Sequence, residues 1–282
     1  MKKSSAYLIV GFLLVAGFAL LLYPSVSSWY NARFQEEAII DYDKTVETMT
    51  EKSRDAALEL AREYNDTLTG QGITDPFIPG GGLVLPDNYI SVLDAGDGMM
   101  GHIEIPKINV KLPIFHGTSA AVLERGVGHM EMTAFPIGGR GNHAVLTSHT
   151  GLPSAFLFDD LDKLEKGDRF YVKIFGNTAA YEVDQIRVVV PSNTKPLLPN
   201  KEQDYVSLVT CTPYAVNTHR LMVRGVRVPF IEEELAGVET TPEGFVVHYD
   251  LVIAITAFVI VITVVARMYI KNRNEARINN QQ

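Results

Sequence analysis

Cysteine is almost absent from this sequence, whose 282 residues include a single one, Cys211. A lone cysteine excludes an internal disulfide, so its thiol serves packing, an intermolecular bond or chemistry. A surplus of positive charge is also lacking, because the net charge is −8 and the pI is near 5.4. This acidic balance, with no basic stripe in the middle of the chain, argues against a nucleic-acid partner.

Charged residues are missing from two long stretches near the ends of the chain. Residues 4–32 contain none, and residues 6–23 are almost wholly apolar. This length approaches the roughly 20 residues that a helix needs to cross a bilayer. Residues 251–266 are also uncharged, and the run extends back to residue 245 if His248 and Asp250 lie at the membrane interface. Both stretches are therefore predicted to be transmembrane helices.

Positive residues flank the two stretches on the sides that face the chain ends: Lys2 and Lys3 precede the first, and Arg267, Lys271, Arg273 and Arg277 follow the second. The positive-inside tendency then predicts that both termini are cytoplasmic and that residues 33–244 are outside the cell. A cleaved signal peptide is the alternative for the first stretch, because a charged start and an apolar core also fit that segment.

The region between the stretches changes character twice. Residues 33–69 contain no Gly or Pro and repeat apolar residues at steps of three and four, which predicts an amphipathic helical hairpin or one long helix. Residues 70–99 are rich in Gly, Pro and Asp and predict a long loop. The predicted segments are 1–32 (cytoplasmic start and first membrane helix), 33–69 (helical), 70–99 (loop), 100–232 (β-domain), 233–244 (linker), 245–267 (second membrane helix) and 268–282 (basic cytoplasmic tail).

The β-domain consists of short runs rich in β-branched residues, separated by Gly, Pro, Asn and Asp. This pattern favours a mainly β fold, a closed or nearly closed barrel, over alternating β and α layers. Only residues 120–124 and 154–164 are predicted to be locally helical. The expected strands are 102–105, 110–114, 144–147, 169–174, 181–190, 205–210 and 220–228.

Three side chains at predicted strand ends suggest acyl-transfer chemistry. Cys211 ends an apolar run just before Thr-Pro-Tyr, and His149 follows another run just before Gly-Leu-Pro. Arg220 comes nine residues after Cys211, on the strand expected to return beside it. A nucleophile, a proton carrier and a cation that stabilises an oxyanion are what a cysteine acyl-transfer enzyme requires. The alternative for Cys211 is a buried structural cysteine.

Other residues compete for these roles. No His, Asp and Glu cluster has metal-ligand spacing, so the sequence predicts neither a metal nor a cofactor. His143 and His219 are the alternatives to His149, and Arg224 and Arg227 are the alternatives to Arg220. His102, His116 and His129 are interpreted as surface or satisfied core residues.

Residues 208–225, with the sequence LVTCTPYAVNTHRLMVRG, resemble the active-site signature of sortases, specifically the pilus-assembling class C enzymes of Gram-positive bacteria. Residues 101–108, 113–118, 126–129 and 151–154 are also similar to this family. The resemblance implies a sortase-type β-barrel in which Cys211 is the nucleophile, His149 transfers protons and Arg220 is the catalytic arginine. Three residues depart from the family pattern: Ser207 where Thr is usual, and Ser148 and Thr150 where Gly and Arg are common.

The tripeptide Asp75-Pro76-Phe77 in the long loop resembles the lid motif of class C sortases. By this resemblance Asp75 pairs with Arg220 and Phe77 covers Cys211, so that the lid occupies the active site. The alternative is an ordinary Asp-Pro turn.

The resemblance implies a membrane-anchored transpeptidase that cleaves an LPxTG-like sorting signal between Thr and Gly and forms a thioacyl enzyme. Its expected partners are pilin proteins with C-terminal sorting signals, a lysine of an acceptor pilin and the membrane. Two alternatives remain within enzymes: a sortase that attaches proteins to cell-wall precursor, and a cysteine endopeptidase. A pilus-base scaffold without turnover is the non-enzymatic alternative.

Overall fold

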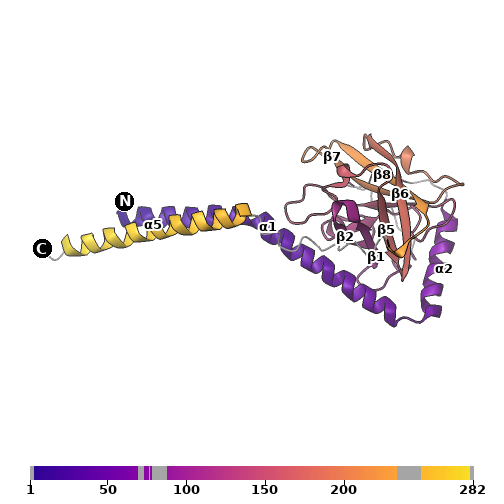
Figure 1. Cartoon of the computed structure of the whole chain (residues 1–282), viewed down its shortest axis with the longest axis horizontal. Coiled ribbons are helices and arrows are strands. Elements are labelled where there is room, and N and C mark those ends of the chain that lie inside the picture. The colour runs from indigo at the N-terminus through magenta and orange to yellow at the C-terminus, as the bar shows by residue number, and fades with distance from the viewer. Residues whose placement is uncertain (1–2, 69–72, 76, 78–87, 234–248, 280–282) are drawn as a thin grey trace. The chain divides into compact units, whose positions relative to one another are not determined.

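The computed structural model describes residues 3–68, 73–75, 77, 88–233 and 249–279 (Figure 1). The chain forms two compact units, one of Met1–Trp29 with Glu243–Gln282 and the other of Tyr30–Pro242. The second unit contains every residue that the sequence nominates for chemistry.

The first unit is built from the start of α1 (Lys3–Thr48) and from α5 (Tyr249–Asn279). Within α1, Ile9–Thr48 is long and apolar enough to cross a membrane, with a mean hydropathy of 2.3 in its most apolar window and none of that window buried. Phe18 of α1 stacks on Phe258 of α5 with ring centroids 3.9 Å apart. The second crossing, by residues 245–267, stays a prediction, and residues 245–248 lie outside the described part of the chain.

The segment boundary predicted after residue 32 does not coincide with the end of a helix. A single helix, α1, runs from Lys3 to Thr48 and contains Pro24 in its interior. It continues because residues 25–48 include no further Pro and no Gly, the two residues that most disfavour a helix interior. The helical character expected for residues 33–69 is thus divided between the end of α1 and a second helix.

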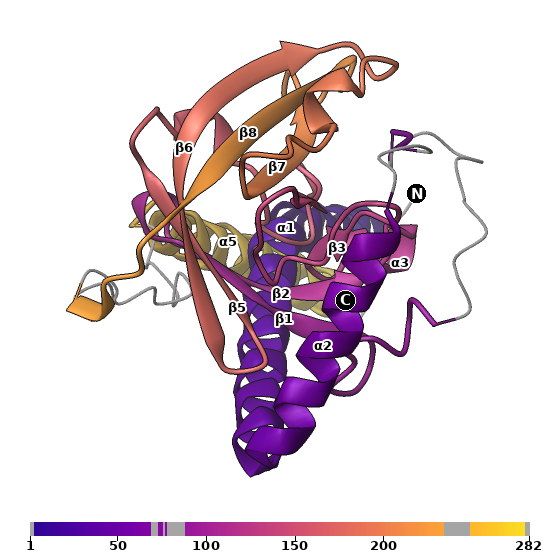
Figure 2. The same ribbon diagram turned by 90° about the vertical axis from the view of Figure 1, so that its right-hand side faces the viewer.

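That second helix, α2 (Glu51–Thr67), starts at Thr50, whose hydroxyl oxygen accepts a hydrogen bond from the Ser53 N–H at 3.2 Å. Such a cap satisfies one of the amide groups left without a partner in the first helical turn. Helix α2 buries Leu58, Ala61 and Tyr64, which fits the amphipathic pattern of its sequence. Figure 2 shows α2 beside the strands of the second unit.

Asn65 is the polar side chain that fixes α2 to the β-domain. Its amide oxygen accepts the Phe135 N–H at 2.7 Å and its amide nitrogen donates to the Phe135 carbonyl at 3.2 Å. Asn65→Ala is expected to lower the free energy of unfolding by about 2 kcal/mol, because two buried backbone groups lose their partners. Chemical denaturation would measure the change. Asp66→Ala, at an exposed neighbouring position, is the control and should have a negligible effect; an equal loss in both variants would contradict the prediction.

The β-domain is a closed barrel, as the sequence predicts (Figure 2). The order of its strands around the barrel is β1-β2-β3-β4-β7-β8-β6-β5. Its core consists of alternating apolar residues such as Ile103, Ile114 and Leu208, all fully buried. Single turns of 3₁₀ helix connect the strands: Pro106–Ile108, Leu161–Lys163 and Lys195–Leu197. The other elements are β1 (Met99–Ile105), β2 (Val110–His116), α3 (Ala120–Leu123), β3 (Val127–His129), β4 (His143–Thr147), β5 (Arg169–Ile174), β6 (Asn177–Val189), β7 (Tyr205–Thr212) and β8 (His219–Val228).

Two predictions about local structure were incomplete or wrong. The short strand β3 was not expected, because three residues are too few to show a period; it exists through parallel pairing with β2 and antiparallel pairing with β4. The helix expected over residues 154–164 is absent apart from the single turn Leu161–Lys163. In its place, the Leu157 N–H donates to the carboxylate of Asp159, a side-chain bond that competes with helical pairing.

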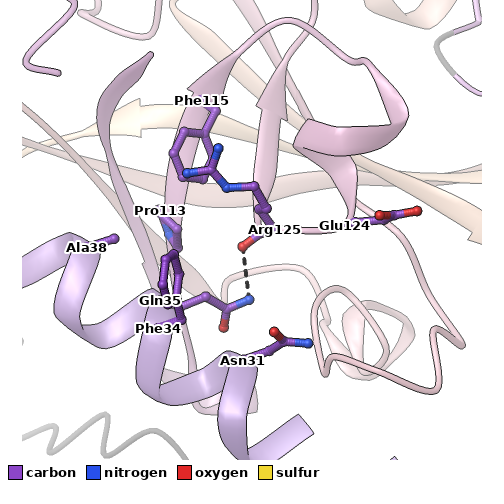
Figure 3. A pocket seen from close by; sticks show the side chains of 8 residues that line it. All are labelled: Asn31, Phe34, Gln35, Ala38, Pro113, Phe115, Glu124 and Arg125. Carbon is purple, nitrogen blue, oxygen red and sulfur yellow. Dashed lines mark hydrogen bonds between the residues drawn. The ribbon is translucent and has the colours of Figure 1, made fainter. Parts of the chain in front are cut away.

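Helix α1 also packs on the barrel within the second unit. Gln35 donates from its side-chain amide to the Arg125 carbonyl at 3.1 Å, and the Arg125 guanidinium lies 4.6 Å from the centre of the Phe115 ring. Figure 3 shows this contact around a hollow of about 30 Å³. An adjoining groove of about 440 Å³ continues along α1 as far as Thr45. The helix therefore covers part of the barrel while leaving an open groove at its edge.

Candidate active site

Cys211 and Arg220 lie opposite each other on adjacent strands. They are direct partners in the antiparallel β7–β8 pair, as the hairpin predicted from the sequence requires. Cys211 is buried, with 8% of its surface exposed. The connecting turn uses positive φ angles at Ala215 and Asn217, at 61° and 59°. The hairpin thus places the thiol and the guanidinium at one end of the barrel.

His149 reaches the same end through the parallel pairing of β4 with β7. Thr147 is aligned with Val209, so His149 and Cys211 are each two positions beyond an aligned pair. The alignment continues past the strand ends, because Ser148 N–H donates to the Val209 carbonyl at 3.2 Å and Thr210 Oγ1 donates to the Ser148 carbonyl at 2.8 Å. Parallel strands therefore present both residues at the same barrel edge.

The loops that follow these two strands are in contact. Gly151 has φ +73°, and a Cβ atom on it would lie 3.1 Å from Cε2 of Tyr214. Glycine is required here both by the positive φ and by the approach of the aromatic ring. The loop after His149 is consequently packed against the loop after Cys211.

Asp75 forms a bidentate ion pair with Arg220 in this structure. Arg220 Nε donates to Asp75 Oδ1 at 2.9 Å and Nη2 donates to Oδ2 at 2.7 Å, while Nη1 donates to the carbonyls of Asn217 and His219 at 3.0 Å each. The two charged side chains are 6% and 3% exposed. A buried fork-to-carboxylate pair of this kind holds both groups in a fixed orientation.

Phe77 lies over the same group of residues. Its ring centre is 5.0 Å from the Arg220 guanidinium carbon and 5.6 Å from the centre of the His149 ring. Asp75 and Phe77 therefore contact Arg220, and Phe77 also contacts His149. Pro76, the third residue of the predicted lid, lies outside the described residues.

Burial keeps both the thiol and the imidazole uncharged near pH 7. Burial raises the pKa of Cys211 above its ordinary value; Arg220 opposes this change and the Asp75 carboxylate adds to it. Burial also lowers the pKa of His149, against the smaller effect of Glu124. A higher thiol pKa and a lower imidazole pKa both favour the neutral forms, so Cys211 and His149 form a neutral pair in this structure.

His143, the nearest competitor of His149, is a core residue. Its Nε2 lies 2.8 Å from Ser207 Oγ and its Nδ1 lies 3.1 Å from the Leu198 carbonyl oxygen. Burial lowers the pKa of His143 to about 4. Both ring nitrogens are therefore engaged and the ring is neutral. The contact also gives a structural use to Ser207, one of the three departures from the family pattern.

Two of the three remaining core histidines are satisfied as expected. His116 lies within 2.9 Å of the carbonyl oxygens of Gly98 and Val92. His129 lies 2.8 Å from both Tyr89 Oη and the Ala134 carbonyl oxygen. The expectation was wrong for His102, which is 2% exposed but whose Nδ1 has no hydrogen-bond partner among the described residues. Two carboxylates lie near the ring: Glu104 of the same strand, 3.4 Å from Nε2, and Asp43 of α1, 4.0 Å from Nδ1.

The alternative arginines are engaged elsewhere. Arg224 Nε donates to Asp184 at 3.0 Å, and its guanidinium lies 4.0 Å from the centre of the Tyr205 ring. Arg227 lies 3.8 Å from the Asp204 carboxylate. Arg220 is therefore the arginine that the register places opposite Cys211.

Sequence reasoning missed the residues that hold the His149 loop. Ser148 is fully buried, and its hydroxyl donates to the Gly126 carbonyl at 2.7 Å. The carboxylate of Asp159 accepts from the Gly151 N–H at 2.7 Å and from the Leu157 N–H at 2.8 Å. Asp159 lies in a segment for which the sequence predicts a helix, so no local signal marked it as a loop residue.

The barrel and the Cys–His–Arg arrangement at its edge are those of a cysteine acyl-transfer enzyme, and comparisons with known proteins give the family. Residues 103–228 match the Sortase domain family. Sortase C-1 from Streptococcus pneumoniae is similar at 45% identity, with a TM-score of 0.66 over 69% of this chain and 100% of that one. A pilus-related sortase C of Group B Streptococcus is similar at 43% identity, with a TM-score of 0.63 over 67% and 96% of the two chains.

The chain belongs to the sortase family of cysteine transpeptidases. Its solved structural neighbours include the class C, pilus-related enzymes. Among curated relatives, Sortase D of Bacillus subtilis is 33% identical over 41% of this chain, and this match spans 55% of the relative's length. Sortase A of Bacillus anthracis is 24% identical over 80% of this chain and 96% of the relative.

Proposed function

We propose that this protein is a pilin-polymerising sortase, anchored in the membrane with its β-domain outside the cell. It cleaves an LPxTG-like sorting signal between Thr and Gly and transfers the acyl group to a lysine amine of another pilin. The observation that carries this proposal is the cross-strand pair of Cys211 and Arg220, with His149 at the same barrel edge. The similarity to pilus-related sortases supports the choice of pilins.

In the first half of the reaction, the Cys211 sulfur attacks the Thr carbonyl carbon and His149 accepts the thiol proton. The tetrahedral intermediate carries a negative oxygen, which the Arg220 guanidinium stabilises. When the Thr–Gly bond breaks, His149 returns the proton to the departing glycine amine, and a thioester to Cys211 remains.

In the second half, a lysine amine attacks the thioester carbonyl and His149 removes the amine proton. The C–S bond then breaks and Cys211 regains its proton, so that an isopeptide bond replaces the original peptide bond. No cofactor is needed, because the thioester retains the energy of the cleaved bond. Asp75 and Phe77 act as a lid, since they contact the arginine and the histidine that the sorting signal must reach.

Membrane anchoring is part of the proposal. The apolar length of α1 supports one crossing, and the uncharged run in α5 supports the second, with both termini in the cytoplasm. Two membrane anchors keep the β-domain next to the membrane and so raise the effective concentration of membrane-borne substrates at the site.

Incubation of the full chain with an LPxTG-type peptide tests the reaction. We expect intact-mass spectrometry to detect a hydroxylamine-labile acyl adduct on the wild type and none on Cys211→Ala. Addition of a pilin fragment with free lysines should discharge the adduct into an amide-linked product. Ser207→Ala, which changes a buried hydroxyl on the same strand, is the control and should retain the adduct. An adduct that persists in Cys211→Ala would overturn the assignment of the nucleophile.

A further inference from the structure

The loop between β4 and the turn Leu161–Lys163 carries His149, and Asp159 closes it. One carboxylate oxygen of Asp159 accepts the Gly151 N–H at 2.7 Å and the other accepts the Leu157 N–H at 2.8 Å. A third bond joins the same two ends, because the Phe158 N–H donates to the carbonyl of His149 at 3.1 Å. The backbone of His149 is therefore tied to the residue that precedes Asp159.

The loop itself, residues 148–160, contains no helix or strand. Strand β4 ends at Thr147, and the next regular turn begins at Leu161. Hydrogen bonds to an ionised carboxylate are about twice as strong as those between neutral groups. The two bonds to Asp159 are therefore charge-assisted, and they join Gly151, two positions after His149, to Leu157 at the far end of the loop.

The His149 loop also packs against the turn that follows Cys211. Gly151, which donates to Asp159, is the residue that faces Tyr214 from the turn after Cys211. A shift of Gly151 would move the contact between the two loops as well as the backbone of His149. The position of Asp159 therefore affects both partners of the proton transfer.

We propose that Asp159 is a positioning residue for the transpeptidation, which fixes the His149 loop so that the imidazole is aligned with Cys211. This inference rests on the proposed function for its consequence in catalysis. The hydrogen bonds of the Asp159 carboxylate go to backbone N–H groups of the loop, not to the thiol or the imidazole. Asp159 therefore acts through the loop backbone and not as a catalytic residue.

Single-turnover acylation of the full chain in detergent micelles distinguishes misalignment of His149, which lowers the rate constant, from loss of folded protein, which lowers the acylated fraction. Asp159→Ala is expected to slow the rate constant on the order of tenfold to a hundredfold, because a misplacement of about 1 Å costs this much. KM and the final fraction of acylated protein should stay near wild type. Asp159→Asn keeps one acceptor oxygen and should give an intermediate rate. A reduced acylated fraction with an unchanged rate constant would overturn the proposal in favour of a purely structural role.

A second measurement needs no substrate, so it separates failure of this inference from failure of the proposed function. In protein with ¹³C-labelled histidine, with the His149 signal assigned through His149→Asn, Asp159→Ala should change the ring shifts of His149. Its titration should move toward the ordinary histidine value, because a released loop exposes the ring to water. The matched control is Asp160→Asn, whose carboxylate pairs with Lys163 at 2.6 Å on the surface. An identical His149 spectrum and titration in Asp159→Ala and wild type would reject the positioning role.

Discussion

Replacing Asp75 and Phe77 together by alanine is expected to raise the rate of Cys211 alkylation at pH 7 several-fold or more, because the thiolate fraction grows as the thiol pKa falls and access to the thiol increases. Two physical changes act in the same direction. Loss of the Asp75 carboxylate removes a charge that raises the thiol pKa and leaves the Arg220 charge, which lowers it, without its partner. Loss of the Phe77 ring uncovers His149 and Arg220.

The pH dependence of iodoacetamide alkylation measures this effect and gives its sign. The wild-type thiol stays protonated to higher pH, so the alkylation profile of the double variant should shift to lower pH. Asp75→Asn removes the charge at nearly constant size and should produce most of the shift, whereas Phe77→Ala should mainly increase access. A profile that moves to higher pH in Asp75→Asn would contradict the electrostatic explanation.

Arg220→Ala is expected to reduce the rate of thioacyl formation on the order of a hundredfold or more, because the oxyanion loses its charged donor. The same change raises the thiol pKa further, since Arg220 is the group that lowers it. Arg220→Lys should recover little, because a lysine provides a point charge and cannot reproduce the fork that reaches both Asp75 and two backbone carbonyls. Single-turnover kinetics with the sorting peptide measures both variants.

A double-mutant comparison tests whether Asp75 acts through Arg220. Asp75→Ala should accelerate acylation in the wild-type background and have a much smaller effect in the Arg220→Ala background, because the ion pair is then already broken. Equal acceleration in both backgrounds would show that the lid residue works independently of the arginine. The comparison therefore separates pairing from simple obstruction of the site.

Local sequence patterns were enough to predict the class of fold and to nominate the residues proposed for the chemistry. Short β-branched runs between turn residues favour a barrel over layered βα units, because strand and helix periods differ in the sequence. The nine-residue spacing from Cys211 to Arg220 fits a hairpin, so a cross-strand pair could be expected from local geometry. The register of β7 with β8 selects Arg220 over Arg224 and Arg227. The two membrane helices are also predicted from local features, the length of each apolar stretch and the charges beside it. The prediction of the second crossing depends on these features.

Which side chains come together at the barrel edge depends on long-range contacts in the folded protein. His149 lies 62 positions before Cys211 in the sequence, and their shared edge depends on the parallel pairing of β4 with β7, a non-local contact that no local pattern encodes. The same holds for Asp75, whose partner is 145 residues away. It also holds for the burial that engages His143 and leaves His102 Nδ1 without a hydrogen bond to any residue that the structure describes. Asp159 was missed because its side chain overrides the helical preference of its own segment. Sequence patterns thus specify local geometry and residue chemistry, whereas burial and long-range pairing decide which residues meet.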